Sequence, residues 1–166
     1  MERGMSLIEL LVYIAIVSIV VVVLSATYIS FLNARAKTEA VAITDTALRY
    51  VAETLTRDVE RATSIVTPAS GVVGTSTLLM HGSSTIAYAL LDGALTRTVD
   101  GVAETLTSDR VVVTQFALTH TENTQEVTGS TFDGLRWQLQ AEHAYGANEY
   151  RYDAARHGAA SRRSFE

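Results

Sequence analysis

The hydrophobic pattern divides the chain at Arg35. Between Leu10 and Leu32 the sequence reads LLVYIAIVSIVVVVLSATYISFL, and no charged residue occurs from Leu10 until Arg35. A helix of about 23 residues rises roughly 35 Å, enough to cross a hydrocarbon core about 30 Å thick. The β-branched run Ile19–Val23 would favour a strand in water, but a lone strand in lipid leaves its backbone groups unsatisfied. The pattern therefore predicts a membrane-spanning helix.

Two other structures remain open for this apolar run. A buried core helix would need surrounding elements, and no later segment is long or apolar enough to enclose it. A cleaved secretory signal would have MERG as its basic region, with Arg3 as the one basic side chain. Its nearest cleavage site would end at Ala26, with Leu24 where a small residue is expected. Both alternatives fit the run less well than a membrane helix does.

The helical period continues beyond Arg35 while charged residues return. Apolar residues recur at three-, four- and seven-residue spacings, which predicts an amphipathic helix with one apolar stripe. The stripe consists of Val41, Leu48, Val51, Leu55, Val59 and Ala62. Charged residues, Asp58 among them, are expected on the other faces. We expect the helix to end near Ser64–Ile65, because Pro68 and Gly71 cannot continue it.

The apolar stripe needs a cover, and the C-terminal half of the chain can supply one. A strict heptad does not persist along the stripe, so a sheet formed by the same chain is expected in preference to a coiled-coil partner. Residues 72–153 alternate between short apolar runs and turn residues, which predicts antiparallel strands. Asp92-Gly93 joins Ile86–Leu91 to Ala94–Val99, a strong two-residue hairpin signal. Asp100-Gly101 offers a second turn, and the GVVG run at 71–74 is expected to be a flexible linker.

Two longer strands follow these hairpins. Val111–Thr119 is expected to be the longest strand, and Leu135–Glu142 alternates as a half-buried antiparallel strand does. The residues expected to face the core are Val112, Phe116 and Leu118 in the first strand and Leu135, Trp137, Leu139 and Ala141 in the second. The polar segment His120–Asp133 is expected to be a loop, and Glu149–Asp153 a last edge strand. The sequence thus predicts an α+β fold, a long N-terminal helix packed on a small antiparallel sheet.

Composition narrows the function classes. The chain has 166 residues, 48% hydrophobic and 19% charged, with a net charge of −5. Apolar residues are too abundant for a disordered chain, and an acidic balance argues against nucleic acid as a partner. Because cysteine is absent, disulfides, thiolate metal sites and cysteine nucleophiles are excluded.

No catalytic or metal-binding motif is found in the sequence. The histidines are far apart and form no local ligand pair; they are His81, His120, His143 and His157. The segment from Asp92 to Asp100 lacks the alternating acidic residues of a calcium loop. We therefore expect no catalytic residue, no metal and no cofactor, and a structural or binding role in place of an enzymatic one.

The junction before the apolar run is the most informative segment. Gly4 precedes Met5-Ser6-Leu7-Ile8-Glu9, and Glu9 is a lone acid at the start of a membrane helix. A capping box would explain Ser6 and Glu9, because the two side chains satisfy free amides at a helix start. It does not explain the position of Gly4 or the shortness of the segment before it.

The run GMSLIELLVYIAIVS resembles the N-terminal signature of type IV pilins and pseudopilins. That signature is a glycine, the residue that becomes the mature N-terminus, and T/S-L-I/L-E-L/V-L followed by a long apolar helix. Met5 replaces the usual phenylalanine, the leader is short and carries Glu2 beside Arg3, and the helix lacks the proline of many major pilins. In the head, Ile86–Arg97 and Glu104–Phe116 are similar to the J-type minor pseudopilins.

The resemblance implies a site and its partners. A prepilin peptidase would cut after Gly4 and methylate the new α-amine of Met5. The Glu9 carboxylate would pair with that amine on a neighbouring subunit, which makes Glu9 an assembly residue. The parts implied are a leader at 1–4, a transmembrane helix at 5–34, a stem helix at 35–65, a β head at 66–153 and a flexible tail at 154–166.

The resemblance also implies a location and a role. The helix would lie in membrane lipid of the bacterial inner membrane, with the head outside the cytoplasm. Other subunits and an inner-membrane assembly platform would be its partners, in a type II secretion pseudopilus or a type IV pilus. A minor, initiating subunit is the favoured role. A major pilin, or an unprocessed single-pass binding domain, is the alternative.

Overall fold

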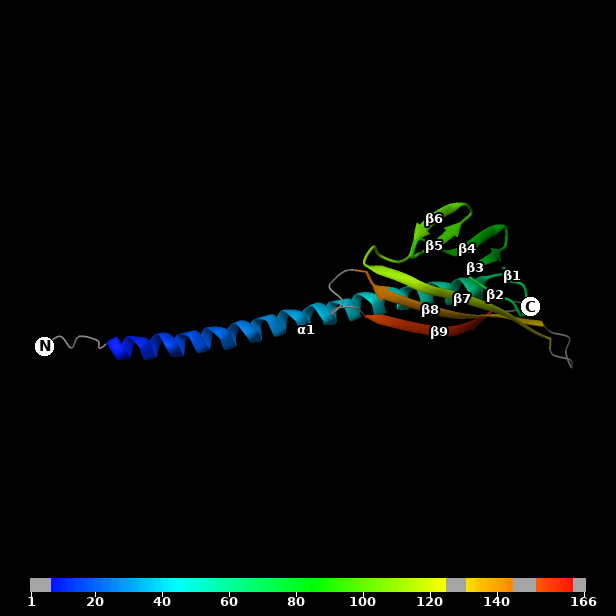
Figure 1. Ribbon diagram of the computed structural model, residues 1–166. Coiled ribbons are helices and arrows are strands. Elements are labelled where there is room, and N and C mark those ends of the chain that lie inside the picture. The colour runs from blue at the N-terminus through cyan, green and yellow to red at the C-terminus, as the bar shows by residue number, and fades with distance from the viewer. Residues whose placement is uncertain (1–6, 125–130, 145–151, 163–166) are drawn as a thin grey trace. The chain divides into compact units, whose positions relative to one another are not determined.

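The computed structural model describes residues 7–124, 131–144 and 152–162. The chain forms two compact units, residues 1–38 and residues 39–166. The long helix α1, Leu7–Arg61, begins in the first unit and continues into the second (Figure 1). Within the first unit the helix is apolar enough and long enough to cross a membrane, and its large apolar side chains are exposed. The predicted long apolar helix is thus confirmed.

Helix α1 ends earlier than the sequence predicts. Its last helical residue is Arg61, and Ser64–Thr67 forms strand β1 where the helix was expected to end. The Thr63 amide donates to the Met80 carbonyl at 2.7 Å, and Ser64 pairs with Met80. The β-branched run Ile65-Val66-Thr67 favours an extended backbone, so pairing with β3 replaces the last predicted turn of helix.

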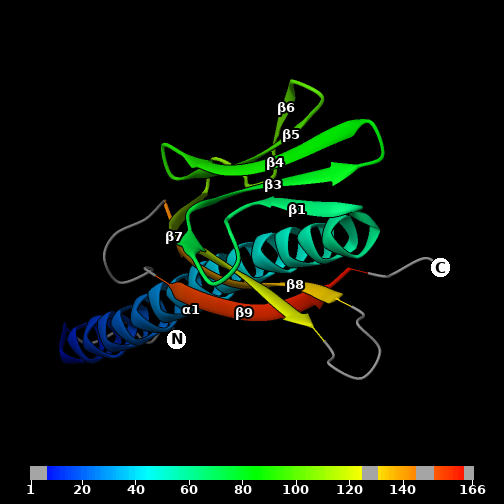
Figure 2. The same ribbon diagram turned by 90° about the vertical axis from the view of Figure 1, so that its right-hand side faces the viewer.

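The head contains two antiparallel sheets, where the sequence predicts a single small one. The first has the order β1-β3-β4-β5-β6, with β3 at Ser76–His81, β4 at Ser84–Leu91, β5 at Ala94–Val99 and β6 at Val102–Thr105. The second has the order β2-β7-β8-β9, with β2 at Val73–Gly74, β7 at Val111–Thr124, β8 at Thr131–His143 and β9 at Asp153–Ser161. The later turns of α1 lie between the two sheets (Figure 2). The predicted α+β class, a long helix followed by antiparallel strands, is confirmed.

The Asp92-Gly93 hairpin forms as predicted and also joins the two sheets. Both residues have positive φ, 50° and 78°, as a two-residue hairpin turn requires. A Cβ on Gly93 would lie 2.9 Å from Cγ1 of Val112, so the strands approach closely only because a glycine is present. The Gly93 carbonyl accepts a hydrogen bond from the Val113 amide at 2.7 Å. The tip of the β4–β5 hairpin is therefore fixed to the start of β7.

The core is built on the predicted stripe of α1, with one exception. Leu48, Val51, Leu55 and Val59 are fully buried, and Ala62 is nearly so. At the start of the head, however, Ala40 and Thr44 are buried while Val41 is only half-buried. We attribute this to cover on only one flank of the helix, the flank that carries Ala40 and Thr44.

A β-bulge corrects the predicted face of β7. Val113 is buried together with Phe116 and Leu118, and the predicted Val112 is half-buried. The register with β8 shifts between Val113 and Gln115, so one extra residue reverses the alternation along the strand. In β8 the expected alternation holds without a shift, and the buried residues are Leu135, Trp137, Leu139 and Ala141.

The predicted loop at 120–133 was wrong at both ends. Strand β7 continues to Thr124 and β8 begins at Thr131, while residues 125–130 lie outside the described residues. His120 pairs with Leu135 and is itself buried. The polar composition of this segment concealed a regular ladder, because backbone pairing makes no demand on side-chain polarity.

The predicted flexible tail was also wrong over residues 154–161. These residues belong to β9, which pairs with β8 from Glu142↔Asp153 to Gly134↔Ser161. Gly158 lies opposite Trp137, and a Cβ at this glycine would come within 2.3 Å of the indole Cζ2. The small residues that suggested a frayed tail therefore make room for a core tryptophan. Of the predicted edge strand Glu149–Asp153, the structure describes Tyr152 and Asp153, and Asp153 is the first residue of β9.

Candidate processing and assembly site

The residues of the predicted cleavage site lie outside the described part of the chain. Helix α1 begins at Leu7, so Gly4, Met5 and Ser6 precede the first residue that the structure describes. Cleavage after Gly4 and methylation of Met5 remain predictions. Glu9 lies in the first turn of α1. A carboxylate there interacts favourably with the positive end of the helix dipole.

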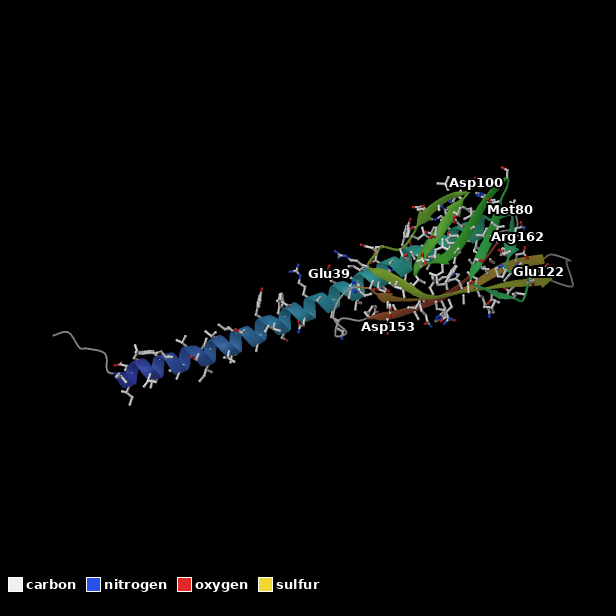
Figure 3. The ribbon with its side chains drawn as sticks, turned by 45° about the horizontal axis from the view of Figure 1, so that its top comes forward. Glu39, Met80, Asp100, Glu122, Asp153 and Arg162 are labelled. Carbon is white, nitrogen blue, oxygen red and sulfur yellow. The ribbon has the colours of Figure 1, made fainter. Side chains whose placement is uncertain are left out.

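An exposed apolar surface follows Glu9 along the helix. Leu7 is 78% exposed, Ile8 is 73% exposed and Val22 is 67% exposed. Figure 3 shows the side chains of this part of α1 standing free around the helix. Apolar side chains left in water on this scale would cost about 25 cal/mol per Å². The surface therefore suits lipid or another apolar surface.

Two hydroxyl groups within this apolar surface are satisfied by the helix itself. The Ser18 hydroxyl donates to the Ile14 carbonyl at 2.7 Å, and the Thr27 hydroxyl donates to the Val23 carbonyl at 2.9 Å. Such bonds to the preceding turn remove the cost of placing a hydroxyl in hydrocarbon. Glu9 is then the one charged side chain between Leu7 and Arg35. Its carboxylate sits where a charge is expensive unless a counter-ion approaches.

The head contains a buried polar cluster that the sequence did not predict. Asp58, expected on a solvent face of the stem, is only 7% exposed. Its Oδ2 accepts from the Tyr88 hydroxyl at 2.5 Å and from Arg97 Nε at 2.7 Å, and Oδ1 accepts from Arg97 Nη2 at 3.2 Å. Burial, followed by the hydrogen bond to Asp58, raises the pKa of the Tyr88 hydroxyl. The hydrogen bond to Asp58 raises the pKa of Arg97, so Arg97 stays charged and Tyr88 stays neutral. The hydrogen bonds among these three side chains hold the stem to the first sheet.

A second cluster lies around His120 and Asp133. Nδ1 of His120 lies 3.1 Å from the Pro68 carbonyl oxygen, and Nε2 lies 3.7 Å from Oδ1 of Asp133. Arg162 pairs with Asp133 at 3.5 Å and donates to the Thr63 carbonyl. Figure 3 labels Arg162 beside the strands of the head. These contacts join the end of β9 to β7, β8 and the end of α1, which is a structural role.

Metal chemistry finds no support in the described residues. No group of three or more histidine, aspartate or glutamate side chains that could hold a metal ion occurs in residues 7–124, 131–144 and 152–162. His81, His120 and His157 come from different strands, and His120 is taken up by the Pro68 and Asp133 contacts. The site residues predicted from the sequence, Gly4, Met5 and Glu9, lie at the N-terminal end of the chain.

Comparison with known proteins points to the same end. Residues 1–25 match the family model described as the prokaryotic N-terminal methylation motif. No curated protein and no solved structure matches the chain. The matched residues include Gly4, Met5 and Glu9, together with the first turns of the exposed apolar helix.

Proposed function

We propose that this chain, whose residues 1–25 match the N-terminal methylation motif, belongs to the type IV pilin and pseudopilin family and is a minor subunit that initiates or caps a filament. The filament would be a type II secretion pseudopilus or a type IV pilus. The observation that carries the proposal is the continuity of two features. The methylation motif at residues 1–25 runs directly into a helix whose apolar side chains are exposed.

Processing comes first in the proposed sequence of events. A prepilin peptidase cuts after Gly4 and transfers one methyl group to the new α-amine of Met5. Before cleavage, the helix anchors the chain in the inner membrane with its head outside the cytoplasm. An ATPase-driven assembly platform then moves the subunit into the filament, where its apolar helix packs on those of other subunits.

Glu9 sets the register of that packing. Its carboxylate is costly in an apolar bundle, and the methylated amine of Met5 on a neighbouring subunit supplies the opposite charge. One subunit position places the two charges together, whereas a shift by one helical turn leaves both unpaired. The ion pair thus favours addition of the subunit to the filament in the correct register, and it contributes less to insertion of the helix into the membrane.

Two sequence features support a minor role over a bulk one. The apolar helix lacks the proline that many major pilins carry. The pattern of residues 86–116 is similar to the J-type minor pseudopilins. A bulk pilin repeats one self-complementary surface along the whole filament, whereas a tip subunit needs to fit only a few specific neighbours.

The mass of the mature N-terminus tests the proposal. Co-expression of the full chain with a prepilin peptidase is expected to remove residues 1–4 and to add one methyl group. Gly4→Val is expected to block cleavage, because a β-branched side chain does not fit the peptidase site. A chain that starts at unmodified Met1 beside an active peptidase would contradict the proposal and would indicate an unprocessed anchored domain.

Variants of Glu9 test the assembly role separately. Glu9→Ala is expected to leave membrane insertion intact and to reduce incorporation into filaments. Glu53→Ala removes an exposed acid from the same helix in the head and serves as the control. Normal incorporation of Glu9→Ala would leave the carboxylate with a capping role only. Quantitative proteomics of sheared filaments tests abundance, and finding this chain as the main subunit would contradict the minor assignment.

A further inference from the structure

A hollow surface lies on the face of the second sheet that is turned away from α1. Residues from β2, β7, β8 and β9 line it. Arg136 lies between Thr119 and Ala159 in the register, and Gln138 lies between Ala117 and His157. Because residues directly opposite on neighbouring strands share a face, these six side chains form one surface, which we call the outer groove.

The floor of the outer groove consists of short side chains. Ala117 and Ala159 have longer side chains around them. Gly158, next to Ala159, has no side chain, and a Cβ added there would point at Trp137. Gln115, Gln138 and Arg136 rise around this floor. A bound segment could therefore approach the sheet closely at its centre while meeting amide and guanidinium groups at its sides.

The charge of the outer groove is opposite to that of the chain. Arg136 and His157 are the ionisable residues that line it, in a chain of net charge −5. Both are exposed. Among the residues that the structure describes, Arg136 has no ion-pair partner, in contrast to Arg97, Arg156 and Arg162. The acids of the same face, Glu142 and Asp153, lie further along the strands beside a second hollow.

These properties select an extended peptide over a helix. The amides of Gln115 and Gln138 need polar partners once a bound segment displaces water from them, and an extended segment offers free backbone N–H and C=O groups. A helix has already satisfied its backbone groups internally and would cover the amides without bonding them. The guanidinium of Arg136 can bind a carboxylate through two parallel hydrogen bonds. The occupant thus combines an extended backbone with an acidic side chain.

We infer that the outer groove binds an extended acidic segment of a neighbouring subunit of different sequence, with one of its carboxylates on Arg136. This inference rests on the proposed function for the source of the partner. In a filament whose helices pack together through α1, contacts on the outer groove would add a second, charge-selective connection between heads. It would choose which neighbour is accepted, because a segment with a basic or apolar residue at that position leaves Arg136 unpaired.

Photo-crosslinking of the full chain in cells that assemble the filament tests this inference. We would replace Gln138 by p-benzoylphenylalanine, and in a control replace Thr105, which is exposed on β6 of the other sheet. The Gln138 probe is expected to crosslink to a segment of another subunit that contains an aspartate or glutamate. Arg136→Glu is expected to lower the yield roughly tenfold, because it replaces attraction by repulsion. Arg57→Glu, an exposed charge reversal on the stem, is expected to leave the yield unchanged.

The outcomes separate this inference from the proposed function. Restoration of the Arg136→Glu yield by an acid-to-lysine change in the crosslinked segment would establish the pairing. A processed and assembled chain that gives no crosslink, or that crosslinks to lipid, to a second copy of itself or to a segment without an acid, overturns the inference alone. An unprocessed chain that still crosslinks to an acidic segment overturns the proposed function alone. An unprocessed chain without a crosslink overturns both.

Discussion

Removal of the Asp58 carboxylate is expected to destabilise the head strongly. The variant Asp58→Ala leaves the Tyr88 hydroxyl and the Arg97 guanidinium without the acceptor that they share. Breaking one partner out of a buried pair costs about 3–5 kcal/mol. The Arg97 side chain is 21% exposed, so water can reach part of it. We therefore expect the lower end of that range, about 3 kcal/mol, which corresponds to a fall in Tm of roughly 10–15 °C for a domain of this size.

The size of the effect distinguishes the cluster from ordinary surface pairs. Tyr88→Phe removes one hydrogen bond to a charged acceptor and is expected to cost about 1.5–3 kcal/mol. The triple variant D58L/Y88F/R97L replaces every polar group by an apolar one and is expected to be close to neutral. Urea unfolding of a soluble fragment that begins near Asn33 measures all of these free energies. A loss below about 1 kcal/mol for Asp58→Ala, the range of surface ion pairs, would refute the claim that this cluster holds the stem to the sheet.

Three further variants test other parts of the head, each by urea unfolding of the same fragment. Gly158→Ala is expected to lose about 1–3 kcal/mol, because the new Cβ would lie 2.3 Å from the Trp137 indole; no loss would show that the ring moves freely. Leu55→Asp places a charge at a fully buried position and is expected to abolish cooperative unfolding; a normal transition would contradict the core. The hydrogen bond from Arg156 lowers the pKa of Asp45 below its ordinary value of 3.8. The stability from this pair is therefore present above that value and is lost as the pH falls below it. Asp45→Asn should then lower the free energy of unfolding less at pH 3 than at pH 7. An equal loss at both pH values would contradict this pH dependence.

Features with a regular period could be predicted from the sequence. The uncharged run before Arg35 specified a long helix, and the two-residue turn at Asp92-Gly93 specified a hairpin. In β8 the alternation through Trp137 and Leu139 identified the buried face without error. These signals are local, because each depends on the spacing of neighbouring residues.

Features that depend on a distant partner could not be predicted. The burial of Asp58 depends on Arg97, which lies 39 residues further along the chain. No residue pattern in the sequence marks the bulge in β7, yet because of the bulge Val113 is buried in the core in place of the predicted Val112. Strand β9 looked like a tail because alanine and glycine are poor strand formers. Only the tryptophan opposite Gly158 explains why a small residue is required there.

At the N-terminal site, too, the sequence could predict a local feature but not a distant partner. The position of Glu9 in the first turn of the helix was predictable from the spacing of Ser6 and Glu9. The partner of Glu9 was not, since the amine proposed for it belongs to another subunit. The pairing of Glu9 with that amine is implied by the resemblance to a known motif and stays a prediction.

The bond between Arg156 and Asp45 has a consequence for the order of events during synthesis. The two residues are 111 positions apart, and β9 completes its sheet only after Arg156 has been made. A ribosome adding about 5–20 residues per second needs roughly 6–22 s to cover that separation. Throughout that delay, the stripe from Leu48 to Val59 is present without its full cover. The time for which the nascent chain exposes this stripe is therefore determined by the distance along the chain between the stem and its last strand.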